Sequence, residues 1–86
     1  MSRYRVELRP AAVRALRLVD PQDRRRLQGA IALLGQEPRP PGARAQQGRP
    51  GYRIRVGSYR ILYVVEDDAL VVVVVTVGHR RDVYDR

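Results

Sequence analysis

The sequence predicts an α+β domain in which two N-terminal helices pack on a mainly antiparallel, four-stranded sheet. Two observations carry this prediction. Residues 3–36 hold a short segment of alternating polarity, followed by two segments with the apolar spacing of helices. Residues 52–77 hold three segments rich in β-branched side chains, separated by short turns. The expected order is β-α-α-β-β-β, and a chain of 86 residues suits one domain over residues 1–86.

The N-terminal elements follow from local signals. Residues 3–8 alternate polar and apolar side chains, which is typical of a half-buried strand. Pro10 fits the first turn of a helix that we expect over residues 10–19. The Asp20-Pro21 pair starts a second helix, because Asp is a favoured N-cap and Pro fits the first helical position. We expect this helix to end near Gln36. Its apolar stripe consists of Leu27, Ala30, Ile31 and Leu34.

The next segment is irregular and leads into a hairpin. Residues 38–51 contain four prolines and three glycines, which predict an irregular loop inside the domain. Strands are expected at Tyr52–Val56 and Tyr59–Glu66, joined by a two-residue Gly57-Ser58 turn of type II′.

The last strand is expected at Leu70–Val77, after a turn at Asp67-Asp68. Its side chains are β-branched on both faces, so it should be a central strand that is covered on both sides. We expect Gly78 to break this strand and a short polar tail to run to Arg86.

Charge and composition limit the chemistry. All 17 basic side chains are arginines, against nine acidic residues, which gives a net charge of +8. With no cysteine and one histidine, the chain is not suited to disulfides, thiolate metal sites, cysteine catalysis or an all-protein zinc site, and we expect no metal or cofactor. The basic excess indicates a polyanionic partner, such as nucleic acid, an acidic protein or an anionic membrane. Codon bias accounts for the absence of lysine, so only the placement of the arginines bears on function.

The arginines are unevenly placed along the chain. Residues 1–60 hold 14 arginines and four acidic residues. Three consecutive arginines, residues 24–26, lie in the first turn of the second helix, where positive charge opposes the helix dipole.

No segment predicts export or membrane insertion. The first ten residues lack the apolar region of a signal peptide, and the longest apolar run, residues 69–77, is nine residues long. A membrane-spanning helix needs about 20 residues. The sequence therefore favours a soluble cytoplasmic protein with no membrane contact.

The Gly57-Ser58 turn also fixes a register that pairs Arg55 with Arg60. By strand parity, Arg53, Arg55 and Arg60 then emerge on the face opposite the apolar one. Like charges directly opposite each other destabilise a sheet by a few tenths to about 1 kcal/mol, so this pair requires an anion or side chains splayed into water. A solvated outer face is the simpler interpretation. However, Arg60 begins a strand that is apolar on both faces, which places it at the rim of a covered sheet.

The segment after the last strand adds further candidates. It reads Gly78-His-Arg-Arg-Asp-Val-Tyr84. His79 is the one side chain of a type that ionises near neutral pH, although a lone histidine is more often a surface or capping residue. Tyr84 can pack its ring on the core or present it to a base for stacking.

Three motifs, in this order, carry a resemblance to a known family. They are Tyr52-Arg-Ile-Arg-Val-Gly-Ser-Tyr-Arg-Ile-Leu-Tyr63, the apolar strand Val71–Val77 and the segment Gly78-His-Arg-Arg-Asp-Val-Tyr84. With the length and the order of elements, they make nearly the whole chain similar to the RelE branch of the RelE/ParE toxin superfamily. The resemblance implies the toxin of a type II toxin–antitoxin system. It implies a metal-independent endoribonuclease that cuts mRNA codons in the ribosomal A site and inhibits translation. The implied partners are the ribosome with its mRNA, a cognate acidic antitoxin, and operator DNA bound only by the toxin–antitoxin complex.

The resemblance also assigns roles to single residues. The family's two basic positions on the second strand fall on Arg53 and Arg55, and its arginine on the next strand falls on Arg60. Its arginine after the last strand's glycine falls on Arg80, on the leaving-group side, and its C-terminal tyrosine falls on Tyr84, which stacks on or positions the base. We assign stabilisation of the phosphorane to Arg60 with Arg53 or Arg55. The expected catalytic residues are Arg55, Arg60, Arg80 and Tyr84, and the expected RNA-binding residues are Arg53, Arg55, Arg60 and Arg81.

The chain departs from the family in its general base. The best-studied pattern has lysines at the positions of Arg53 and Arg55, and one of them is proposed as the base. A desolvated lysine can lose its proton, whereas a guanidinium stays charged, so Arg55 is an implausible base. His79, a ribosomal RNA group, or no true base remain as options. We hypothesise the last, with positioning and electrostatics carrying the rate.

Two other functions are compatible with the sequence. A ParE-like toxin that poisons DNA gyrase shares the fold but has no need of residues for RNA cleavage. The joint presence of Arg60, Arg80 and Tyr84 therefore favours the ribonuclease. A non-catalytic RNA-binding module, or an antitoxin-bound regulator, would bind RNA in a salt-sensitive way without cutting it.

Overall fold

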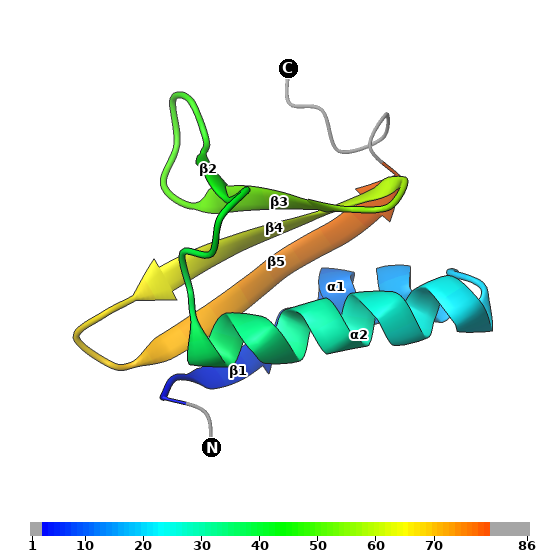
Figure 1. The fold of residues 1–86 in the computed structure, drawn as a ribbon, viewed down its shortest axis with the longest axis horizontal. Helices are drawn as coiled ribbons and strands as arrows, with labels where there is room; N and C mark the ends of the chain where they lie inside the picture. Colours follow the sequence, from blue (N-terminus) through cyan, green and yellow to red (C-terminus); the bar gives the residue numbers. More distant parts are fainter. Residues whose placement is uncertain (1–2, 80–86) are drawn as a thin grey trace.

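Two helices lie against one face of a five-stranded sheet (Figure 1). The computed structural model describes residues 3–79. Its elements are, in chain order, β1 (Arg5–Leu8), α1 (Pro10–Arg17), α2 (Pro21–Gln36), β2 (Arg44–Ala45), β3 (Tyr52–Val56), β4 (Tyr59–Glu66) and β5 (Val71–His79). The strand order is β1-β5-β4-β3-β2. β1 runs parallel to β5, and the other neighbouring strands are antiparallel.

This architecture confirms the predicted α+β class, with both helices on one face of a mainly antiparallel sheet. The structure has five strands rather than the four expected, because β2 lies inside the segment predicted to be irregular. β2 pairs Arg44 with Arg53 and Ala45 with Tyr52. It is two residues long and has no alternating apolar pattern, so only its pairing with β3 defines it as a strand.

β5 departs from the prediction in two ways. It continues to His79, so Gly78 does not break the strand as expected. Gly78 pairs with Arg60 of β4, and this pairing outweighs the low strand propensity of glycine. β5 lies inside the sheet, as predicted, but the helices cover only one of its faces (Figure 1). Val73, on the other face by strand alternation, is half-buried.

The start of α2 confirms the predicted Asp20-Pro21 signal. The Asp20 side chain accepts hydrogen bonds from the backbone N–H groups of Gln22 and Asp23, at 3.0 and 3.2 Å. These bonds hold the pKa of Asp20 below its ordinary value, because they stabilise the charged carboxylate. The helix then runs to Gln36, as expected.

The end of α1 depends on a residue that the sequence had marked as unfavourable. The Arg24 guanidinium donates hydrogen bonds to the backbone carbonyls of Leu16, Arg17 and Val19, at 3.0, 3.2 and 2.8 Å. The Leu16 and Arg17 carbonyls lie in the last turn of α1, where a helix leaves acceptors unsatisfied and favours positive charge, and the Val19 carbonyl lies in the connection to α2. α1 ends at Arg17, two residues before the expected boundary. Arg24 therefore stabilises the end of α1 from its place in the first turns of α2.

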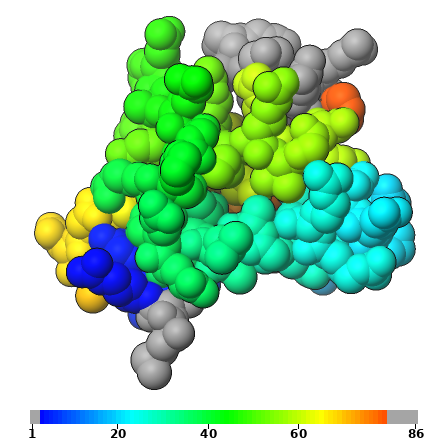
Figure 2. Space-filling view, viewed as in Figure 1, coloured from blue at the N-terminus to red at the C-terminus, as the bar shows by residue number. Residues whose placement is uncertain are grey.

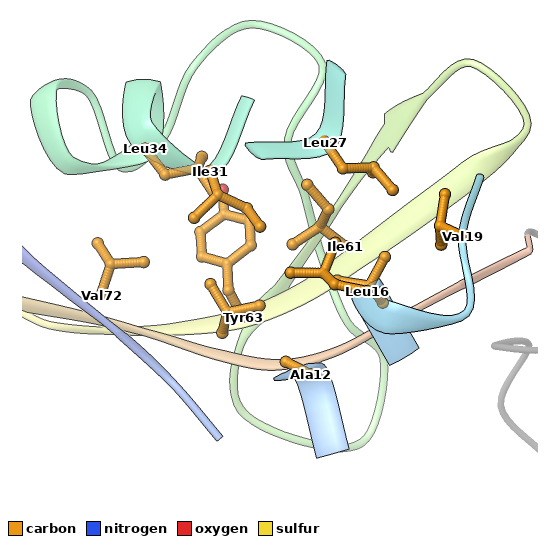
Figure 3. Close-up of a cluster of buried hydrophobic side chains, with 11 residues drawn as sticks. Ala12, Leu16, Val19, Leu27, Ile31, Leu34, Ile61, Tyr63 and Val72 are labelled. Atoms are coloured by element: carbon orange, nitrogen blue, oxygen red, sulfur yellow. The ribbon is translucent and has the colours of Figure 1, made fainter. Parts of the chain in front are cut away.

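The hydrophobic core lies between the helices and the sheet (Figure 3). Tyr63 is its largest fully buried side chain, and its hydroxyl donates a 2.7 Å hydrogen bond to the carbonyl of Pro38. Burial raises the pKa of Tyr63 to about 12, because the phenolate would lose its hydration. The core residues are Ala12, Leu16, Val19, Leu27, Ile31, Leu34, Ile61, Tyr63, Val72, Val74 and Val77.

No helix among residues 3–79 is long and apolar enough to span a membrane.

Candidate nucleic-acid interface

The hairpin of β3 and β4 carries the predicted arginines, and its turn has the predicted geometry. Gly57 has a φ of +60°, whereas Ser58 is outside the left-handed region, which is the pattern of a type II′ turn. The register that follows pairs Arg55 with Arg60, as predicted. The two guanidinium-bearing residues are thus direct cross-strand neighbours.

The two faces of this hairpin differ in polarity. On the helix side, the apolar residues of β3 and Tyr59 at the start of β4 pack against the core. Because side chains alternate along a strand, Arg53, Arg55 and Arg60 emerge on the opposite face, away from the helices. Arg53 and Arg60 are half-buried and Arg55 is exposed. The structure therefore brings these three predicted residues together on one face.

These arginines line a pocket of about 330 Å³, which we call the arginine pocket. Its wall is the segment that follows α2, which rises from the helix layer past the sheet (Figures 1 and 2). Four of the described lining residues are arginines and none is acidic. A planar guanidinium group can donate two parallel hydrogen bonds to two oxygens of one phosphate, so the arginine pocket is suited to a phosphate-bearing ligand. Its lining residues are Pro41, Gly42, Arg44, Arg53, Ile54, Arg55 and Arg60.

Arg44 is the lining arginine that the sequence did not single out. It lies on β2 directly opposite Arg53, just as Arg55 lies opposite Arg60. The arginine pocket therefore contains two cross-strand pairs of like charge, each of which costs a few tenths to about 1 kcal/mol. An anion between the guanidinium groups would offset that cost. A segment rich in proline and glycine has no register of its own, so the sequence held no signal for Arg44.

The histidine lies away from this face. His79 pairs with Tyr59 across β4 and β5, and their rings meet edge to face with centroids 5.8 Å apart. Directly paired residues project to the same face of a sheet, and Tyr59 packs on the helix side. The structure therefore places His79 on the face opposite Arg60.

The rest of the predicted site lies in the C-terminal tail. Arg80, Arg81 and Tyr84 are outside the described residues. Within residues 3–79, no group of three or more His, Cys, Asp or Glu side chains is placed to hold a metal ion.

A second polar cluster joins the segment after α2 to the turn between β4 and β5. We call it the Asp67 cluster; it consists of Tyr4, Arg39, Tyr52 and Asp67. The Arg39 guanidinium donates to both carboxylate oxygens of Asp67, at 2.7 and 3.2 Å, and its Nε donates to the Tyr52 hydroxyl at 2.9 Å. The Tyr4 hydroxyl donates to Asp67 at 2.7 Å. No local pattern predicts this cluster, because its members are distant in sequence.

The hydrogen bonds of the Asp67 cluster fix its charge state. Donation from Arg39, and then from Tyr4, holds the pKa of Asp67 below its ordinary value. The bond to Asp67 raises the pKa of Tyr4, because the phenol must keep its proton to donate. At neutral pH the cluster therefore pairs a charged Asp67 with a charged Arg39.

Comparison with protein families identifies the chain. A family model described as the ParE toxin of the type II toxin–antitoxin system parDE matches residues 6–84. The chain belongs to this toxin family. It is thus a toxin of a type II toxin–antitoxin system, within the RelE/ParE superfamily.

Solved structures that resemble the toxin are RelE proteins. The toxin aligns with the RelBE2 toxin–antitoxin complex of Mycobacterium tuberculosis at a TM-score of 0.79 and 28% identity, covering 93% of this chain and 94% of that one. It aligns with the RelE–RelB complex of Pyrococcus horikoshii at 0.78 and 27%, covering 91% and 96%. The intact RelBE complex of Escherichia coli gives 0.78 and 27%, covering 96% and 99%. Comparison with curated protein sequences found no match. The toxin is therefore a RelE-like member of the superfamily.

Proposed function

We propose that this toxin is a metal-independent endoribonuclease that cuts mRNA codons in the ribosomal A site and so inhibits translation. The observation that carries the proposal is the arginine pocket, where the β3–β4 register gathers Arg53, Arg55 and Arg60 on one face. Similarity to RelE structures over more than nine-tenths of the chain supports the same class. A pocket lined by four arginine residues suits an RNA phosphate better than a neutral substrate.

The proposed chemistry is transfer of the RNA phosphate to its own neighbouring hydroxyl. The 2′-oxygen attacks phosphorus and loses its proton, the bond from phosphorus to the 5′-oxygen breaks, and that oxygen takes up a proton. The products are a 2′,3′-cyclic phosphate and a 5′-hydroxyl. Arg60, with Arg53 or Arg55, would donate hydrogen bonds to the phosphorane oxygens as negative charge builds up there. Arg80 would act on the leaving-group side, Tyr84 would stack on or position a base, and Arg81 would bind RNA.

We propose that no side chain of the toxin acts as a true general base. Arg55 occupies a position where relatives carry lysine, and a guanidinium does not give up its proton near neutral pH. His79 shares a face with Tyr59 rather than with Arg60, which weighs against its reaching the same phosphate. In-line positioning of the 2′-hydroxyl and stabilisation of the phosphorane would then carry the rate.

The proposed partners follow from charge and from the relatives. A net charge of +8 suits an acidic antitoxin that covers the arginine pocket and blocks RNA. The M. tuberculosis, P. horikoshii and E. coli structures are toxin–antitoxin complexes. We propose that the toxin likewise binds a cognate antitoxin, and that operator DNA is bound only by the complex. We also propose that the toxin acts in the cytoplasm, because that compartment holds the ribosome.

A second candidate is a ParE-like gyrase poison, which the description of the matching family favours. The two candidates separate in parallel assays. The toxin is incubated with ribosomes carrying a defined mRNA, the mRNA ends are mapped, and DNA supercoiling by gyrase is measured at the same toxin concentration. We expect cuts within the A-site codon and unchanged supercoiling. Inhibited supercoiling with intact mRNA would select the gyrase poison, whereas salt-sensitive RNA binding without cuts would select a non-catalytic RNA-binding module or regulator.

A further inference from the structure

We propose that the Asp67 cluster positions the wall of the arginine pocket: by clamping Arg39, Asp67 holds the Pro41-Gly42 segment beside the arginines and thereby sets the affinity for single-stranded RNA. This inference rests on the proposed function and adds a positioning residue to it. Asp67 touches none of the lining residues through a hydrogen bond described for residues 3–79, so its effect would pass through Arg39.

The wall of the arginine pocket is held on its C-terminal side by the pairing of β2 with β3 and on its N-terminal side by contacts near the end of α2. It follows the end of α2, where the Glu37 N–H donates to the Leu33 carbonyl at 2.9 Å and the buried Tyr63 hydroxyl holds the Pro38 carbonyl at 2.7 Å. Arg39 comes next in the chain, two residues before Pro41. Arg39 is therefore the last side-chain anchor that the structure describes before the wall begins.

The clamp joins three parts of the fold. Asp67 lies in the turn after β4, and its carbonyl accepts a 3.2 Å hydrogen bond from the Leu70 N–H. Arg39 reaches it with two guanidinium nitrogens and holds the Tyr52 hydroxyl with a third. Tyr52 stacks on Tyr63, with ring centroids 5.7 Å apart, and directly precedes Arg53 on β3. The wall and the strand that carries Arg53 are thus tied to the same guanidinium group.

The geometry of this pair favours a local positioning role. The Arg39 and Asp67 side chains are 45% and 53% exposed, and exposed ion pairs contribute little to global stability. A two-nitrogen contact to a carboxylate nevertheless fixes direction as well as distance, which a single contact does not. Glycine at position 42 has a φ of +97°, so the wall bends sharply just beyond the point that Arg39 holds.

Replacing Asp67 with asparagine distinguishes a positioning role of Asp67 from an effect of its charge. Removing one negative charge from a basic protein strengthens its attraction for RNA if charge alone matters. Loss of the Arg39–Asp67 contact weakens RNA binding instead. Asp67→Asn should therefore lower the Kd if only charge matters and raise it if the contact positions the wall. Asp68→Asn is the matched control, because it removes the same charge from the same turn. No hydrogen bond or ion pair of Asp68 is described within residues 3–79.

The experiment measures the Kd of the full-length toxin for a 2′-O-methyl RNA oligonucleotide, by fluorescence anisotropy at low salt. The proposal predicts that Asp67→Asn raises the Kd about three- to tenfold, while Asp68→Asn leaves it equal or lower. Arg39→Lys keeps the net charge and loses the two-nitrogen contact, so it should raise the Kd to a similar extent. The double variant should lose no more than either single variant, because both remove one contact.

Amide hydrogen exchange gives a readout at the wall itself. The Ala43 N–H donates to the Pro40 carbonyl at 3.0 Å, and its exchange should quicken in Asp67→Asn but not in Asp68→Asn. The positioning role of Asp67 is overturned if the wild type binds RNA and Asp67→Asn binds it as tightly as Asp68→Asn does. It is also overturned if exchange of the Ala43 N–H is the same in Asp67→Asn as in the wild type. If the wild type binds no free RNA, this inference is overturned, whereas the proposed function is decided separately by mRNA cleavage on programmed ribosomes.

Discussion

Arg55 and Arg60 face each other across β3 and β4, so both guanidinium groups are available to one phosphate in the proposed reaction. Both side chains are carried by paired strands, so a phosphate bound between them would not require a loop to become ordered. Neither group can act as a base, because a guanidinium keeps its proton. In the proposed mechanism, the residues that bind the phosphate and stabilise the phosphorane are therefore not the groups that transfer the proton.

This separation predicts how the reaction responds to pH. His79→Ala should lower the rate of ribosomal mRNA cleavage by less than about tenfold, since loss of a true general base costs about 100-fold or more. For the same reason, the wild-type rate should show no limb between about pH 6 and 7, where histidine ionises. Single-turnover cleavage measured across that range checks both points. A pH-dependent limb that is present in the wild type and disappears in His79→Ala would assign the base to His79.

At the scale of elements, the junction between the two helices depends on Arg24. Its three hydrogen bonds satisfy carbonyls at the end of α1, while Asp20 satisfies N–H groups at the start of α2. The cost of placing a cation near the start of α2 is offset by what that cation does for α1. These contacts join the end of α1 to the start of α2 across their short connection.

The arginine run at residues 24–26 provides its own control for this role. Arg24→Ala should lower the free energy of unfolding by about 1–2 kcal/mol, because it removes the charged donor from two carbonyls of α1 and from the Val19 carbonyl just beyond it. Arg25→Ala removes the same charge from an exposed side chain one position away and should change stability by less than about 0.5 kcal/mol. Urea denaturation of both variants measures the difference. Equal losses would mean that charge near the start of α2, and not capping of α1, controls stability.

The sequence predicted those elements whose signals are local. Asp20-Pro21 marks the start of α2, and Gly57-Ser58 sets both the β3–β4 turn and the Arg55–Arg60 register. β2 and the continuation of β5 through Gly78 were not predictable, because each exists through pairing with a distant strand. Arg44 and the Arg39–Asp67 contact were missed for the same reason. Parity along β3 and β4 selected Arg53, Arg55 and Arg60, whereas the role of Arg80 and Tyr84 comes from family resemblance.

At the scale of the whole molecule, the fold separates packing from charge. The helices and the core occupy one face of the sheet (Figures 1 and 3), and the arginine pocket opens on the other. Most arginines within residues 3–79 are exposed, so net charge alone would attract RNA to many parts of the surface. We propose that the arginine pocket has a role in mRNA cleavage that total charge cannot replace.

The most direct test compares two variants that each remove one arginine. Arg60→Ala changes the arginine pocket, whereas Arg14→Ala changes an exposed residue of α1 on the helix side. Single-turnover cleavage of an A-site codon on programmed ribosomes gives the rate for each. We predict that Arg60→Ala cuts about 100- to 1,000-fold more slowly than the wild type, while Arg14→Ala stays within about threefold. Equal rates for the two variants would contradict the assignment of catalysis to the arginine pocket.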